Sequence, residues 1–137
     1  MITSLKTQVL SLSQLRALAR YGWEVGVNAS LKYVHNATTN GWELVPWENM
    51  VRSDRPCVNT LTGNELLERM PRHSFVGDTL YSLHVAPAPH GWIVNYCTAE
   101  ITGRTIGSTL ARPTLKDAAF DALLALLALL KKNKETS

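Results

Sequence analysis

The longest apolar stretch of the chain lies close to its C-terminal end. Asp121 is the only polar residue in the run Ala118–Leu130. At about 100° per residue, most leucines fall on one side of a helix together with Ala119 and Phe120. The other alanines fall on the opposite side with Asp117 and Asp121, and Leu129 is the one leucine on that side. The pattern predicts a core helix whose leucine side packs on a sheet or another helix. The alanine side would face water or allow a second helix or subunit to approach closely.

This run is too short to serve as a membrane anchor. As a helix it spans about 20 Å, against about 30 Å for the hydrocarbon core of a bilayer. Thr114 is the expected N-cap, with Asp117 in the first turn. Lys131, Lys132 and Lys134 follow the last expected turn, where positive charge suits the helix dipole.

Two shorter helices are predicted upstream. Leucines recur at helical spacing over residues 12–19, with a serine at position 11 or 13 as the N-cap and a glycine at position 22 as the end. Arg16 and Arg20 are four residues apart and therefore lie on one face of this helix. In the second helix, Thr62 and Glu65 form a capping box, and a proline at position 71 stops it.

Alternating side chains predict antiparallel strands between these helices. The clearest hairpin covers residues 78–100 with its tip at 86–91, and a third strand with two glycines covers 101–109. An Asn-Gly turn at 40–41 predicts an earlier hairpin. One irregular strand or two short ones are expected in 23–34, and a proline-broken loop in 48–63.

The order helix, strands, helix, strands, helix predicts the α+β class. We expect a three-layer α/β/α-type sandwich with a mainly antiparallel sheet and a long apolar C-terminal helix. The 137 residues favour a single domain, with frayed ends at about 1–8 and 133–137.

Composition narrows the class of protein. Hydrophobic residues make up 45% and charged residues 18% of the chain, which is typical of a globular domain. A formal net charge of +3 gives little support to nucleic-acid binding unless the charges cluster. The N-terminal segment has no sustained apolar region, so we expect no signal peptide and a cytoplasmic location. Cys57 and Cys97 are expected to be free thiols, although their spacing leaves a disulfide open.

Candidate catalytic groups are few. The histidines at positions 35, 73, 84 and 90 show no zinc-ligand spacing with each other or with a cysteine, so neither a metal nor a cofactor is predicted. His84 and Cys97 could approach each other across the predicted hairpin as a catalytic pair, but ordinary side chains on a sheet face are the simpler interpretation. Residues 103–109 resemble a phosphate loop faintly but lack its lysine and its spacing. We therefore predict that the protein is not an enzyme.

Arginines near a tryptophan form the best candidate binding surface. If their loops met at one edge, they would make a cationic patch with an aromatic ring beside it, a composition suited to phosphates or an acidic protein. The alternative is ordinary solvated charge. The candidate residues are Trp47, Arg52, Arg55, Arg72, His73, Arg104 and Arg112.

Several phrases together resemble a known family. They are YGWEV, NGWEL, RPCVNTLTGNELLERM, HGWIVNY and ARPTLKDAAFDALLALLALL, in this order along residues 15–130. This order is similar to that of the phage alpha-beta-alpha sandwich family of small phage and prophage proteins. The sequence departs from the family pattern at CVNT and in an extra segment, VRSDR. The resemblance implies a fold and a phage origin, and it supplies no catalytic residues.

Four hypotheses about function follow. The first is a non-catalytic phage accessory protein that binds and inhibits a host factor, most plausibly a defence component such as a CRISPR effector. The second is a sponge that sequesters a nucleotide second messenger between Arg52, Arg55, Arg104 and Arg112 and a tryptophan. The third is an enzyme that uses Cys97 and His84. The fourth is a nucleic-acid binder. A homodimer through the last helix or an edge strand is also open.

Overall fold

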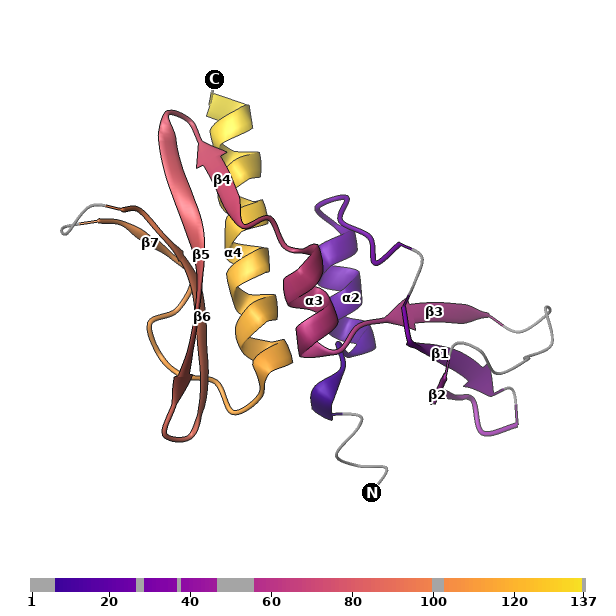
Figure 1. The fold of residues 1–137 in the computed structure, drawn as a ribbon. Helices are drawn as coiled ribbons and strands as arrows, with labels where there is room; N and C mark the ends of the chain where they lie inside the picture. The colour runs from indigo at the N-terminus through magenta and orange to yellow at the C-terminus, as the bar shows by residue number, and fades with distance from the viewer. Residues whose placement is uncertain (1–6, 27–28, 37, 47–55, 100–102, 137) are drawn as a thin grey trace.

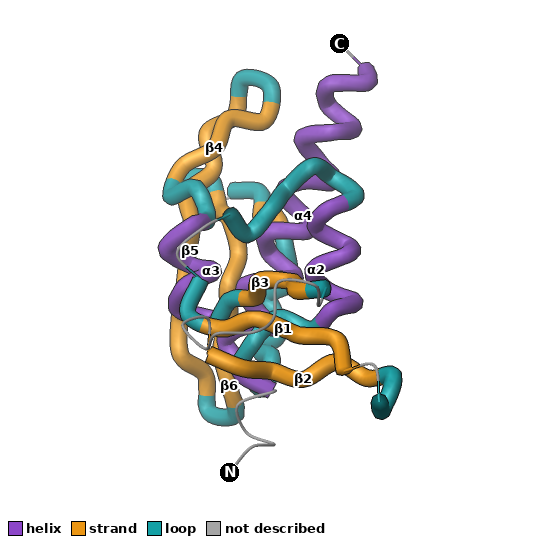
Figure 2. Tube along the Cα trace, turned by 90° about the vertical axis from the view of Figure 1, so that its right-hand side faces the viewer, coloured by secondary structure: helices purple, strands orange, loops and turns teal. Residues whose placement is uncertain are grey.

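The computed structural model describes residues 7–26, 29–36, 38–46, 56–99 and 103–136. Figure 1 shows two β-sheets with the helices between them, and the turned view in Figure 2 agrees with this arrangement. This α+β architecture with antiparallel sheets and a long C-terminal helix confirms the predicted class. The elements are α2 (Leu12–Ala19), β1 (Leu31–Asn36), β2 (Gly41–Pro46), β3 (Cys57–Thr60), α3 (Gly63–Arg69), β4 (His73–Val76), β5 (Thr79–Ala88), β6 (Gly91–Cys97), β7 (Thr105–Ile106) and α4 (Leu115–Thr136).

The two short helices begin at N-caps expected from the sequence, and each N-cap is part of a capping box. Ser11 Oγ accepts the backbone N–H of Gln14 at 3.1 Å, and Gln14 Oε1 accepts the Ser11 N–H at 2.9 Å. In the same way, Thr62 and Glu65 exchange two hydrogen bonds at the start of α3. These bonds satisfy N–H groups that have no partner within a helix, which fixes where α2 and α3 begin.

The three-stranded sheet has the order β2-β1-β3. Asn40 has a φ of 54° at the turn between β1 and β2, which confirms the predicted hairpin. The prediction of a loop throughout 48–63 is wrong at its C-terminal end, because Cys57–Thr60 pairs with β1 as strand β3. Such a short segment shows no clear alternation, and only its pairing with β1 makes it a strand.

The four-stranded sheet has the order β4-β5-β6-β7. The hairpin β5–β6 confirms the clearest strand prediction, with a tighter turn than expected, since β5 continues to Ala88 and β6 starts at Gly91. Strand β4 was not predicted from the sequence. In the structure α3 ends at Arg69, and His73 opens β4 opposite Ser82 of β5.

Helix α4 packs on β6 and on α3 and carries much of the core. Leu123 and Leu126 are each 1% exposed, as the prediction of a buried leucine side requires. The alanine side is buried as well, because a Cβ atom on Gly107 would lie only 3.4 Å from the Ala122 Cα. By contrast, Leu127 is only half-buried. The core-facing side of α4 therefore combines leucine with alanine, and of the two alternatives for the alanine side, close approach of another segment is the one found at Ala122.

Helix α4 also extends further than its apolar run. It continues through the lysines to Thr136, so Lys131 and Lys134 project from helical backbone. Within the described ranges, no helix is both long enough and apolar enough to cross a bilayer. Cys57 on β3 and Cys97 on β6 are not joined by a disulfide.

Candidate functional site

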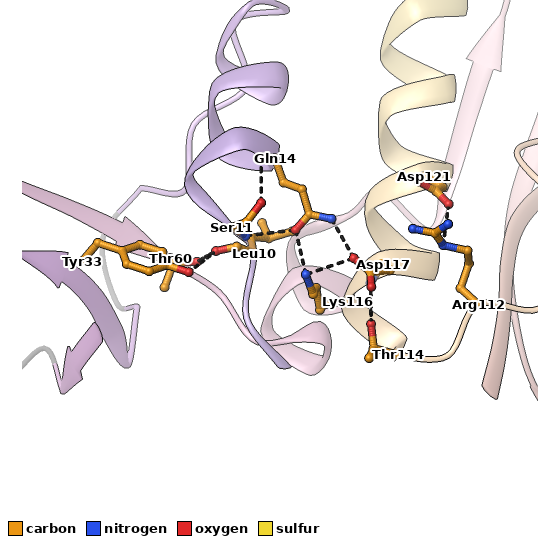
Figure 3. A network of polar contacts seen from close by, with 10 residues as sticks. All are labelled: Leu10, Ser11, Gln14, Tyr33, Thr60, Arg112, Thr114, Lys116, Asp117 and Asp121. Carbon is orange, nitrogen blue, oxygen red and sulfur yellow. Dashed lines mark hydrogen bonds and ion pairs between the residues drawn. The ribbon is translucent and has the colours of Figure 1, made fainter. Parts of the chain in front are cut away.

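A polar network joins α2 to the first turn of α4 (Figure 3). Gln14 Nε2 donates to Asp117 Oδ1 at 2.8 Å, while Lys116 Nζ donates to Gln14 Oε1 at 3.0 Å and lies 3.0 Å from Asp117 Oδ1. Thr114 Oγ1 donates to the other Asp117 oxygen at 2.7 Å. Lys116 is only 9% exposed, so its charge needs both partners. The network fixes how α2 lies along α4.

The network also lowers the pKa of Asp117. Burial alone would raise this pKa, but hydrogen bonds from Thr114, Lys116 and Gln14, together with the charge of Lys116, outweigh it and hold the pKa below the ordinary value of 3.8. Asp121, one turn later, shows the opposite balance. Burial raises its pKa, and the nearby Arg112 offsets only part of that effect.

We expect Asp117→Asn to lower the free energy of unfolding most at neutral pH. Because the folded pKa of Asp117 lies below its unfolded value, the carboxylate stabilises the fold above pH 3.8, and this stability is lost as the pH falls through the folded pKa. The difference from wild type in urea unfolding should therefore shrink below about pH 4. Asp121→Asn is the matched control and should show the reverse trend, with wild type gaining relative stability on acidification. If the stability differences of the two variants from wild type changed with pH in the same direction, the opposite pKa shifts of Asp117 and Asp121 would be contradicted.

Beyond the network, a groove lies between α4 and the C-terminal end of α2 with the two residues that follow it, Arg20 and Tyr21. Two hollows of about 280 and 320 Å³ share Arg20, Tyr21 and Lys131, so they form one continuous depression. We call this depression the α2/α4 groove. Its remaining lining residues are Ala17 and Leu124 in the first hollow, and Leu127, Leu130 and Lys134 in the second.

The groove has an apolar floor and a positively charged rim. Three of its described lining residues, Arg20, Lys131 and Lys134, are cationic, and none is acidic. Tyr21 is 37% exposed, and Lys131 Nζ lies 5.7 Å from the centre of its ring. This cation–π contact contributes about 0.5–1 kcal/mol at an exposed site and holds an aromatic ring where the two hollows meet.

Helical periodicity explains the composition of the floor. Leu124, Leu127, Lys131 and Lys134 are three or four residues apart and form one stripe along α4. Helix α4 extends beyond the end of α2 (Figures 1 and 2), and the stripe begins at Leu124, which lines the first hollow together with Ala17 of α2. Its leucines are half-buried rather than covered.

A third hollow, of about 290 Å³, lies where α3 and α4 begin. Thr62, Thr114 and Trp92 line it, which gives it hydroxyl groups and an aromatic ring. However, the carboxylates of Glu65 and Asp117 already accept hydrogen bonds at these two helix starts. Lys116 also lines the hollow, but its ammonium group is already held by Gln14 and Asp117. An anion here would have to compete with Asp117 for that charge.

The sequence-predicted patch is dispersed where the structure describes it. Arg112 exchanges two backbone hydrogen bonds of 2.8 Å with Trp92 near the start of β6, whereas the Arg104 N–H donates to Thr98 Oγ1 at 3.0 Å just past its end. At about 3.3 Å per residue, these two places are roughly 20 Å apart. Arg112 is also paired with Asp121 at 3.2 Å. Arg104 and Arg112 therefore cannot hold one phosphate together.

The other patch residues divide into two groups. His73 lies opposite Ser82 of β5, in the same cross-strand row as Cys97 and Thr105, and its strand β4 is three strands away from β7. Arg72 lies beside β5 as well, where its carbonyl oxygen accepts the Leu83 N–H. At about 4.8 Å per strand, roughly 14 Å separates His73 from Thr105. Trp47, Arg52 and Arg55 lie outside the described residues.

His84 and Cys97, the candidate catalytic pair, are not directly opposite each other in the hairpin. The register places His84 opposite Asn95 and places Ser82 opposite Cys97, so His84 and Cys97 are diagonal neighbours about 7 Å apart. The Cys97 thiol instead lies 3.1 Å from Asn95 Oδ1. Across the ranges that the structure covers, no three histidine, cysteine or acidic side chains gather as metal ligands would. The segment 103–109 contains the short strand β7, in line with the strand interpretation.

No protein-family model, no curated protein and no solved structure matches this chain. The residues of the α2/α4 groove therefore carry the functional argument by their own chemistry.

Sequence reasoning found parts of this groove without joining them. It placed Arg16 and Arg20 on one helix face and explained the C-terminal lysines by the helix dipole. It did not single out Tyr21. The available signal was the stripe Leu124, Leu127, Lys131 and Lys134, in which apolar residues give way to cations on one side of one helix.

Proposed function

We propose that this chain is a non-catalytic binding protein that captures a protein partner in the α2/α4 groove and thereby inhibits it. The phrases that resemble phage alpha-beta-alpha sandwich proteins favour a host defence component as the partner and the bacterial cytoplasm as the place of action. The observation that supports the proposal is the groove itself. It combines half-buried leucines, an exposed tyrosine and three cations within one depression.

This combination matches the general anatomy of protein-binding surfaces. Tyrosine and arginine are enriched among the residues that dominate binding energy, and they act best beside an apolar centre with a polar rim. In the groove, Tyr21 and Arg20 lie next to Leu124 and Leu127. The nucleotide-sponge hypothesis lacks a comparable arrangement, since Arg104 and Arg112 are at opposite ends of β6.

Reversing the charge of the groove should abolish partner capture. We expect a protein retained from bacterial lysate by the wild-type chain to be lost with Arg20→Glu plus Lys131→Glu, because two attractive charges on the rim become repulsive. The double variant Arg20→Gln plus Lys131→Gln, which only neutralises the two charges, should retain the captured protein at least tenfold more weakly than wild type. The measurement is quantitative mass spectrometry of the captured proteins, followed by an assay of the partner's activity with one equivalent of the chain added.

The matched control is Arg72→Glu plus Arg104→Glu, which makes the same charge change at two exposed residues away from the groove. This control should capture the partner normally. Loss of the partner with the control but not with the groove variants would move the interface to the arginine patch. A partner that the chain binds without inhibiting would refute the inhibitory role. Thermal unfolding of every variant shows whether the fold is kept.

A further inference from the structure

We propose that the α2/α4 groove receives an acidic amphipathic helix of the partner protein, seated along the outer stripe of α4. The inference rests on the proposed function and specifies what kind of segment is captured. It combines the charge of the groove, the backbone chemistry of its walls and the length of its floor.

The charge of the groove selects an acidic partner. Arg20, Lys131 and Lys134 surround the apolar floor, and no described lining residue is acidic. A segment with carboxylates flanking its apolar side chains would place negative charge against each of these cations. Such complementarity speeds association and excludes basic segments.

The walls of the groove favour a helix over an extended segment. One wall is helix α4, and the other is the C-terminal end of α2 with Arg20 and Tyr21, which follow it. The N–H groups of Arg20 and Tyr21 donate to the carbonyl oxygens of Arg16 and Leu18, so the N–H groups of this wall too are already engaged. An extended peptide needs a free strand edge to satisfy its own N–H and C=O groups. A helix satisfies these groups internally and presents apolar side chains at intervals of three or four residues.

The floor has room for a short helix. From Leu124 to Lys134 the stripe runs ten residues along α4. At about 1.5 Å per residue this is about 15 Å, or nearly three helical turns. Tyr21 divides the groove at the point that both hollows share, so its ring would contact the middle of the bound helix.

Designed peptides test the inference with the full-length protein. The probe is a fluorescent synthetic helix of about 14 residues, one turn longer than the floor, with leucines on one face and glutamates beside them. Three companion peptides have the leucines scattered around the helix, a central proline, or lysines in place of the glutamates. Vesicles of phosphatidylglycerol provide a negatively charged membrane for comparison.

Fluorescence anisotropy should show saturable binding of the acidic helix that weakens with added salt. We expect affinity to fall at least tenfold for each companion peptide. The same loss should follow from Arg20→Glu plus Lys131→Glu, and a several-fold loss from Leu127→Ala. The Arg72→Glu plus Arg104→Glu control should bind as the wild type does.

Each contrary result overturns a distinct claim. Equal binding of the proline peptide would show that the groove takes an extended segment, which removes the helix inference and leaves the proposed function in place. Binding to the vesicles in preference to every peptide would show that the groove binds a membrane surface. That result would refute both the helix inference and the proposed function. Absence of peptide binding, while capture from lysate still depends on Arg20 and Lys131, would refute the acidic helix alone.

Discussion

Replacing Gly91 with alanine is expected to lower the free energy of unfolding by about 4 kcal/mol, the sum of overpacking and backbone strain. Gly91 has a φ of 154°, which an L side chain rarely adopts. A Cβ atom there would overlap the carbonyl oxygen of Arg112 and lie 2.7 Å from its carbonyl carbon. This carbonyl accepts the Trp92 N–H at 2.8 Å, so relieving the overlap breaks the link between β6 and the segment that leads into α4.

Gly22→Ala separates backbone strain from overlap. Gly22 also has a positive φ, of 78°, but nothing lies within 4 Å of a Cβ atom placed there. Only strain should remain, about 1–2 kcal/mol. Urea unfolding followed by circular dichroism measures both variants. A loss for Gly91→Ala no larger than that for Gly22→Ala would contradict the close approach of β6 to Arg112.

The leucines of α4 should divide sharply into core and groove residues. We expect Leu126→Ala to lower the free energy of unfolding by about 3 kcal/mol, because removing a fully buried side chain leaves a cavity. Leu126 is 1% exposed. Leu127, its neighbour in the chain, is half-buried on the floor of the groove, so Leu127→Ala should cost about 1 kcal/mol.

The two variants should also differ in binding. Leu127→Ala removes part of the groove floor and should weaken capture of the acidic helix several-fold. Leu126→Ala should leave binding unchanged at a temperature where it remains folded. If Leu127→Ala were as destabilising as Leu126→Ala, the outer side of α4 would belong to the core, and the groove would not exist.

Helix starts and tight turns were predicted correctly where the hydrogen bonds that define them join residues close together in the sequence. Ser11 with Gln14 and Thr62 with Glu65 are three residues apart, and their hydrogen bonds define the starts of α2 and α3. The Asn-Gly turn after β1 follows the same rule. Strand β3 was missed because its identity depends on pairing with β1, whose residue Leu31 lies opposite Thr60. Distant pairing leaves little trace in a short segment of mixed polarity.

The candidate site shows more clearly which features follow from local sequence and which depend on contacts between distant segments. Periodicity alone predicts that α4 is a helix, that most of its leucines and alanines lie on different sides, and that lysines follow them. Contacts between distant segments determine which side faces the core, place Arg104 and Arg112 at opposite ends of β6, and bring Arg20 and Tyr21 beside Lys131. A repeat of 3.6 residues fixes the angles between side chains of one helix, but it carries no information about neighbours that come from segments more than a hundred residues away.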